Sequence, residues 1–129
     1  SHFRKDVTSS AGAYGYAQLM PKTARQLAQN LNRPELTPYD YDDNILLGNS
    51  FYAYLFHRYG WIPFAIAAYN AGEGAVTTWK KRYPFRSPLW IECIPYEETR
   101  NYAKVIWQNA AFYRRIYPEY FGSTPFALD

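Results

Sequence analysis

Apolar residues recur at intervals of three and four along most of this chain, which is the spacing of one face of an α-helix. Ala24, Leu27, Ala28 and Leu31 form one such face. No segment scores better as the apolar and polar alternation of a half-buried strand than as a helix. The pattern predicts an all-α (mainly α) protein. The expected helices cover residues 21–31, 45–59, 63–71, 75–83 and 96–116.

Proline, aspartate and glycine mark the expected helix ends. Pro21 and Pro63 stand in first turns, where the missing amide hydrogen of proline costs nothing. Asp42 or Asp43 is expected to cap the helix that follows it. The run 72–74, Gly-Glu-Gly, is expected to break the chain between the third and fourth helices.

The length of the chain sets its domain organisation. A chain of 129 residues is large enough to bury one hydrophobic core. We therefore predict a single domain over residues 1–129. A minimal hairpin near residues 9–16 is the one β element that the sequence leaves open.

Two amide side chains lie in otherwise apolar stretches that we interpret as helical. Gln18 stands within 15–21, and Asn70 follows Tyr69 in the alanine-rich run that ends at Gly72. A buried amide without a partner costs about 1–3 kcal/mol, so each amide needs a partner or a polar cavity. Because the two amides come from separate segments, we expect one polar cleft that both of them line.

The aromatic content is high, at 20%, with 14 tyrosines and 4 tryptophans. Phenol and indole rings combine an apolar face with a hydrogen-bonding edge. That combination suits a carbohydrate, whose C–H face stacks while its hydroxyl groups form hydrogen bonds. Packing in a small helical core is the alternative interpretation for each ring.

Charge and hydropathy narrow the classes of partner. The net charge of +3 is small and evenly spread, which does not indicate a nucleic-acid-binding protein. The basic clusters at 80–82 and 114–115 are interpreted as solvated helix faces. No apolar stretch approaches the length that crosses a bilayer, so we expect no membrane span.

No metal and no cofactor is expected. His2 and His57 are far apart, and neither has a partner at the spacing of metal ligands. Cys93 has no histidine at a recognisable spacing and is interpreted as an inert thiol. The glycines of 72–74 do not form a phosphate-binding loop.

Two carboxylates stand at the start of the last long helix. At this position Glu97 and Glu98 would stabilise the helix dipole and cap free amides. Glu98 also precedes Tyr102 by four residues, which places an acid and a phenol on one helix face. The residues alone leave the structural and the functional interpretation of Glu98 open.

Three segments carry a family resemblance. They are 9–21 (SSAGAYGYAQLMP), 68–72 (AYNAG) and 94–102 (IPYEETRNY). In this order they resemble successive motifs of the soluble lytic transglycosylases, a family with a goose-type-lysozyme-like catalytic domain. The similarity extends from Ser1 to about Tyr117. It implies a lysozyme-like, compact helical fold.

The resemblance implies a function on peptidoglycan. That family cleaves the β-1,4 bond between N-acetylmuramic acid and N-acetylglucosamine without water. The muramic 6-hydroxyl closes onto C1 and gives a 1,6-anhydro product. One glutamate acts first as general acid and then as base, so the second carboxylate of most glycosidases is not required.

The resemblance also implies where the catalytic acid lies. In the family the catalytic glutamate immediately precedes a serine that is followed, one residue on, by an aromatic. Ser1-His2-Phe3 matches that serine and aromatic, so the expected acid precedes Ser1. We therefore expect a domain truncated just after its catalytic glutamate, and an inactive chain as given. The alternatives are a non-catalytic peptidoglycan-binding module and a lysozyme-type hydrolase.

The remaining site residues are implied by the same motifs. Tyr102 is expected to support catalysis by a hydrogen bond to the acid. Glu98 and Arg100 are expected in the cleft, where they could pair with each other. The expected substrate-binding residues are Ser9, Gln18, Met20, Tyr69, Asn70, Glu98 and Arg100.

Two positions depart from the family pattern. Tyr16-Ala17 replaces the usual Leu-Met, and Glu73 replaces the usual proline. We expect Glu73 to be an exposed turn residue. The resemblance further implies a monomer that acts on peptidoglycan glycan strands in the periplasm or cell envelope of a bacterium.

Overall fold

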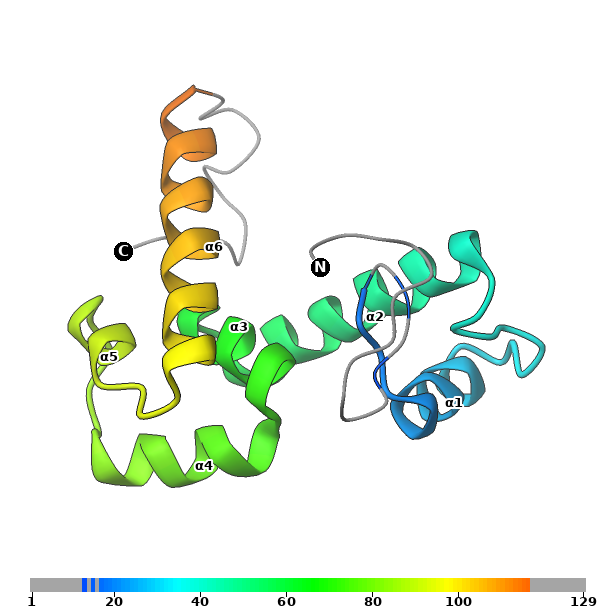
Figure 1. The fold of residues 1–129 in the computed structure, drawn as a ribbon, viewed down its shortest axis with the longest axis horizontal. Helices are drawn as coiled ribbons and strands as arrows, with labels where there is room; N and C mark the ends of the chain where they lie inside the picture. Colours follow the sequence, from blue (N-terminus) through cyan, green and yellow to red (C-terminus); the bar gives the residue numbers. More distant parts are fainter. Residues whose placement is uncertain (1–12, 14, 16, 117–129) are drawn as a thin grey trace. The chain divides into compact units, whose positions relative to one another are not determined.

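The computed structural model describes residues 13, 15 and 17–116, without the side chains of 112–114 and 116. The chain divides into two compact units, residues 1–53 and 54–129, and each is described by itself. The helices of the described part are α1 (Pro21–Asn30), α2 (Tyr41–Tyr59), α3 (Ile62–Ala71), α4 (Glu73–Arg82), α5 (Leu89–Glu92) and α6 (Glu97–Ile116) (Figure 1).

The predicted mainly α fold is confirmed. The described residues contain no strand, and Leu19 is an isolated bridge residue. The hairpin proposed near residues 9–16 falls almost entirely outside the described residues. The single-domain organisation stays a prediction.

The first unit contains α1 and the first part of α2. The predicted apolar face of α1 buries Ala24, Leu27 and Ala28. Leu31 was wrongly assigned to this face, because α1 ends at Asn30 and Leu31 is 40% exposed. Other buried side chains of this unit are Leu19, Leu36 and Leu47.

A buried asparagine joins distant segments of the first unit. Asn44 is only 1% exposed. Its Oδ1 accepts a hydrogen bond from the Ala17 amide at 2.7 Å, and its Nδ2 donates to the Pro38 carbonyl oxygen at 3.0 Å. Gly15 has a φ of 81°, and a Cβ added there would lie 2.7 Å from the Asn44 Cγ. The Asn44 amide therefore occupies the space in which a side chain at residue 15 would begin.

The start of α2 differs from the prediction. The helix begins at Tyr41, and the Asp43 amide donates to Asp40 Oδ1 at 2.9 Å. Asp40 is therefore the N-cap. Asp42 and Asp43, which we expected to cap the helix, lie in its first turn, where their charge complements the helix dipole.

The second unit is built around α3. Every residue from Ile62 to Ala68 is buried. In this unit α3 packs against both α4 and α6, and α5 packs against α6 (Figure 1). Ala65, Ala67 and Ala68 present little bulk, so the neighbouring helices can approach the α3 backbone closely.

Aromatic rings fill the core of the second unit. Phe64 lies edge-on to Trp61 at a ring-centroid distance of 4.6 Å and to Trp90 at 4.8 Å. Trp79 lies edge-on to Tyr96 at 5.1 Å. Edge-to-face pairs at these distances are the favoured geometry of aromatic side chains. The core-packing interpretation therefore holds for Trp61, Phe64, Trp79 and Trp90, whereas Tyr96 is 57% exposed.

The connection between α3 and α4 is shorter than expected. Gly72, with a φ of 94°, is the only residue between the two helices, because Glu73 already begins α4. Residues 73 and 74 were therefore wrongly assigned to the break. The left-handed backbone at Gly72 explains why glycine suits this position.

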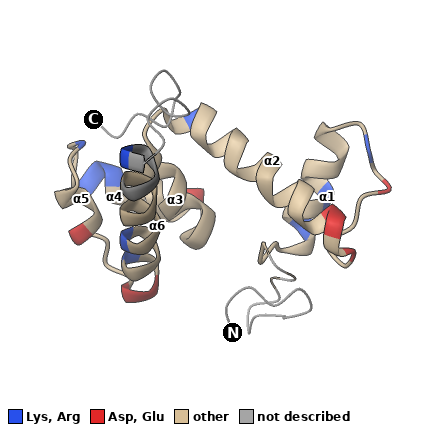
Figure 2. Cartoon of the chain, turned by 90° about the horizontal axis from the view of Figure 1, so that it is seen from above, with Lys and Arg blue, Asp and Glu red and all other residues tan. Residues whose placement is uncertain are grey.

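The basic run at the end of α4 is only partly a solvated face. Lys81 and Arg82 are exposed, and the last turn of α4 is blue in Figure 2. Lys80 is half-buried, with its Nζ 5.2 Å from the Tyr59 ring centroid and 4.9 Å from that of Phe64. At these distances the ammonium group stabilises the aromatic core by cation–π interaction.

Gly15→Ala should destabilise the first unit. Alanine at a φ of 81° costs about 1–2 kcal/mol in backbone strain, and its Cβ would also displace the Asn44 amide. We expect a loss of at least about 1–2 kcal/mol in the free energy of unfolding, measured by urea denaturation with circular dichroism.

Gly74→Ala is the matched control. Gly74 lies in α4 with nothing within 4 Å of an added Cβ. Alanine is the better helix former, so this variant should be neutral or more stable by up to about 1 kcal/mol. Equal stability losses in the two variants would contradict the steric role of Asn44.

Candidate functional site

A hydrogen bond joins the end of α3 to the start of α6. The Thr99 hydroxyl donates to Asn70 Oδ1 at 2.6 Å. Thr99 is 2% exposed, whereas Asn70 is exposed at the surface end of α3. The predicted polar partner of the Asn70 amide is therefore a buried threonine. Because Thr99 occupies Oδ1, the amide is held in one orientation, and its Nδ2 can donate to a ligand.

Two tyrosines lie beside this pair. Tyr69 is half-buried on α3, and Tyr102 is half-buried on α6. Burial raises the pKa of the Tyr69 phenol, and the neighbouring Tyr102 phenol raises it further. Tyr69 therefore remains a neutral hydrogen-bond donor throughout the physiological pH range. The structure thus brings together Tyr69, Asn70 and Tyr102, as the sequence motifs implied.

The two charged residues of the α6 motif do not pair as suggested. Arg100 Nη1 donates to the Ile94 carbonyl oxygen at 2.9 Å, which fixes the loop before α6. Glu98 is exposed in the first turn of α6. Arg100 therefore positions the backbone, and Glu98 stands where it complements the positive end of the helix dipole.

Gln18 lies in a turn, so our assignment of this residue to a helix was wrong. Its φ is 51°, and its Nε2 donates to the Gly15 carbonyl oxygen at 2.7 Å. One N–H of the amide is thus used within its own turn, and the side chain is exposed. Met20 is 41% exposed, so it does not fill the core.

The common cleft of Gln18 and Asn70 stays a prediction. The two residues belong to different units of the chain, residues 1–53 and 54–129. Ser9 lies outside the described residues. The site described here is therefore the cluster of Tyr69, Asn70, Thr99 and Tyr102.

Glu73 is not the exposed turn residue that we expected. It is half-buried at the start of α4, and its Oε1 lies 2.6 Å from Arg58 Nε. The Tyr54 hydroxyl also donates to this carboxylate, at 3.3 Å. Burial, and then the negative charge of Glu73, raise the pKa of Tyr54. Glu73 therefore connects the end of α2 to the start of α4.

Thr99 is the site residue that sequence reasoning missed. It was quoted within the motif 94–102 but given no role. The sequence did contain a signal that Thr99 faces the core. Thr99 and Ala103 are four residues apart, so they share a helix face. Ala103 is fully buried, so the hydroxyl of Thr99 had to find an internal partner.

The described residues offer no metal centre and no spanning helix. Within residues 13, 15 and 17–116, no three or more His, Cys, Asp or Glu side chains are grouped as metal ligands. No helix in that same part of the chain has the length and apolar character needed to cross a membrane.

Curated relatives are similar in sequence to this chain over most of its length. The soluble lytic murein transglycosylase of Salmonella typhimurium is 35% identical over 126 residues, which cover 90% of this chain and 19% of the relative. The protein of the same name from Escherichia coli K12 is 35% identical over 121 residues, or 88% of this chain and 19% of the relative. The chain thus spans about a fifth of the length of these relatives.

Solved structures show the same likeness. The 70 kDa soluble lytic transglycosylase SLT70 from Escherichia coli matches 98% of this chain and 21% of its own, with a TM-score of 0.78 and 32% identity. The lytic transglycosylase Slt from Pseudomonas aeruginosa, solved as an inactive Glu-to-Gln mutant, matches 97% of this chain and 21% of its own, with a TM-score of 0.75 and 32% identity.

The family assignment rests on both sequence and structure. The family model of the Transglycosylase SLT domain matches residues 1–88, which is more than half of the chain. The motif segment 68–72 lies within that match, and α6 lies within the longer alignments to the relatives. From these matches, this chain belongs to the Transglycosylase SLT domain family.

Proposed function

We propose that this chain belongs to the catalytic domain of a peptidoglycan lytic transglycosylase. That enzyme would cleave the β-1,4 bond between N-acetylmuramic acid and N-acetylglucosamine and release a 1,6-anhydro product. The observation that carries the proposal is the 2.6 Å hydrogen bond between Thr99 and Asn70. This bond fixes an exposed amide donor beside two phenols, an arrangement suited to the acetamido and hydroxyl groups of an amino sugar.

The reaction needs one carboxylic acid. In the proposed first step, a glutamate directly before Ser1 protonates the glycosidic oxygen, and the bond between C1 and that oxygen breaks. The acetamido group of the substrate stabilises the positive charge that develops at C1. The resulting carboxylate then takes the proton of the 6-hydroxyl as its oxygen bonds to C1. The glutamate is regenerated, and no water is consumed.

Each described residue of the cluster has a role in this scheme. Asn70 Nδ2 is proposed to donate to the substrate, because the hydrogen bond from Thr99 to Oδ1 holds the amide in one orientation. Tyr69 supplies a neutral phenol, since its raised pKa keeps it protonated. Tyr102 is proposed to hydrogen-bond the catalytic acid. Gln18 and Met20 are proposed to contact sugar from the first unit, as are Ser9, Glu98 and Arg100 from their own segments.

The setting of the reaction is also a proposal. Peptidoglycan lies in the bacterial envelope, so we place the enzyme there, in the periplasm where one exists. We further propose that it acts as a monomer without a cofactor. The names of the relatives, soluble lytic murein transglycosylases, support the substrate class.

Product analysis tests the proposed reaction. The natural chain, with the residues that precede Ser1, should convert purified peptidoglycan into 1,6-anhydro muropeptides that mass spectrometry resolves. Replacing the glutamate before Ser1 by glutamine should abolish the products. Asn70→Ala should lower kcat/KM about 100-fold, the usual loss for one catalytic hydrogen-bond donor. Asn101→Ala, an exposed asparagine of α6, is the matched control and should retain full activity.

Other products would identify the alternatives. Reducing-end muropeptides would indicate a lysozyme-type hydrolase. Binding without any cleavage would indicate a non-catalytic peptidoglycan-binding module. Either result would overturn the proposed reaction.

Thr99→Val should weaken activity although Thr99 is buried. The variant keeps the shape but removes the hydrogen bond to Asn70, so we expect a loss of about 1 kcal/mol in unfolding free energy. With the amide no longer oriented, kcat/KM should fall about tenfold, measured with the same muropeptide assay. Thr99→Ser retains the hydroxyl and should restore most of the activity. Equal activity of the valine and serine variants would contradict the positioning role.

Tyr69→Phe should change the pH dependence of stability. The unfolded tyrosine loses its proton near pH 10, whereas the folded phenol has a raised pKa and keeps its proton. The stabilisation from Tyr69 is thus present below about pH 10 and is lost as the pH rises. The fall of unfolding free energy above pH 10 should be shallower in Tyr69→Phe, by up to about 1.4 kcal/mol per pH unit. Urea titrations at several alkaline pH values measure this, and parallel curves would contradict it.

A further inference from the structure

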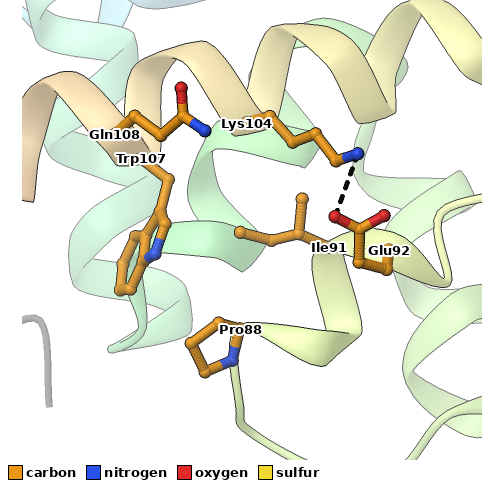
Figure 3. Close-up of a pocket in the computed structure, with 6 residues that line it drawn as sticks. All are labelled: Pro88, Ile91, Glu92, Lys104, Trp107 and Gln108. Carbon is orange, nitrogen blue, oxygen red and sulfur yellow. Dashed lines mark ion pairs between the residues drawn. The ribbon is translucent and has the colours of Figure 1, made fainter.

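A pocket lies between α5 and α6, within the second unit. Its volume is about 200 Å³, and its lining residues are Pro88, Ile91, Glu92, Lys104, Trp107 and Gln108. Figure 3 shows Trp107 at one end of this pocket and the Lys104–Glu92 ion pair at the other. Ile91 and Pro88 form the wall opposite α6.

The pocket combines an aromatic wall with balanced charge. Lys104 Nζ lies 2.9 Å from Glu92 Oε1, so the ion pair leaves no net charge at the site. A neutral ligand therefore fits better than an anion or a cation. The second carboxylate oxygen of Glu92 can accept a hydrogen bond, the Lys104 ammonium can donate, and the exposed amide of Gln108 can do both.

Trp107 is held in place by the core. Its ring centroid lies 6.5 Å from that of Trp61, with the planes tilted by 58°. Trp107 is half-buried and also lines the pocket. A rigid indole of this kind can stack on the C–H face of a sugar at little entropic cost.

The pocket lies on a different side of α6 from the candidate site. Trp107 is five positions after Tyr102, so their side chains lie about 140° apart around the helix axis. Lys104 is two positions after Tyr102, so these side chains lie about 160° apart. A ligand in this pocket therefore does not compete for the side of α6 that carries Tyr102.

We propose that the α5–α6 pocket binds one amino-sugar ring of a glycan strand outside the catalytic cleft. This proposal rests on the proposed action on peptidoglycan. The cavity is smaller than the roughly 300–1,000 Å³ of sites for drug-sized ligands, so it accepts a single ring. A weak second site raises the affinity for polymeric substrate, because a strand held at one site is at high effective concentration at the other.

Titration with the N-acetylglucosamine tetramer tests the second site. The indole N–H signals of ¹⁵N-labelled protein, with that of Trp107 assigned through Trp107→Phe, report binding at this residue. We expect a saturable shift of the Trp107 signal, and the same shift in an Asn70→Ala background, where cleft binding is weakened. A Trp107 signal that does not move at saturation of the cleft would overturn the proposal.

Variants separate ligand binding from core packing. The exchange of both Lys104 and Gln108 for alanine, which replaces no fully buried residue, should weaken the binding on the order of tenfold, measured from the Trp107 signal. Val105→Ala, at an exposed α6 position outside the pocket, is the matched control and should bind as the parent does. Unchanged affinity in the Lys104 and Gln108 double variant would also overturn the proposal.

Activity distinguishes this proposal from the proposed reaction. The double variant should release products more slowly from intact peptidoglycan, through a higher KM, while cleaving short soluble strands at the parent rate. Absence of anhydro products in the parent protein would refute the proposed reaction, yet the Trp107 shift would still be measured. Equal loss on both substrates would show that the pocket residues act through the cleft and would refute a separate site.

Discussion

The second unit depends on the burial of α3 between its neighbours. Ile62–Ala68 is enclosed because Ala65, Ala67 and Ala68 let α4 and α6 approach closely. The polar residues of this helix come only at its last turn, where the enclosure ends. The same packing that removes apolar surface from water thus presents Tyr69 and Asn70 beside the first turns of α6. The geometry of the site is a consequence of core packing rather than of loop conformation.

Periodic features of this fold could be predicted from the sequence. The helices over 21–30, 62–71 and 97–116 were expected within two residues of their observed ends, because long apolar repeats with proline or tyrosine-proline boundaries define them. The grouping of Tyr69, Asn70 and Tyr102 was implied by the family resemblance, which rests on the motifs that contain them. In the structure the Thr99 hydroxyl donates to Asn70 Oδ1, and the Tyr102 phenol raises the pKa of Tyr69, whereas the roles of these residues in the reaction stay predictions.

Pairings between distant residues could not be predicted in this way. The Ala17 amide donates to Asn44 Oδ1 although the two residues are 27 positions apart, and no pattern in either segment indicates this hydrogen bond. Glu73 looked like a turn residue because its partners, Tyr54 and Arg58, lie on α2, two helices earlier in the chain. The short α5 has four residues, too few to show any helical period. Each of these features depends on tertiary contact and not on local preference.

The tryptophans of the aromatic core have a practical consequence. All four lie after residue 60 and within one network, with Trp61 and Trp79 at 6.1 and 6.5 Å from Trp90, and Trp107 at 6.5 Å from Trp61. Residues 1–53 contain no tryptophan. Tryptophan fluorescence, excited selectively over that of tyrosine, therefore follows melting of the second unit alone, whereas far-ultraviolet dichroism follows the helices of both. Comparing the two optical transitions would reveal whether the halves of this molecule melt as one cooperative block, without any added label.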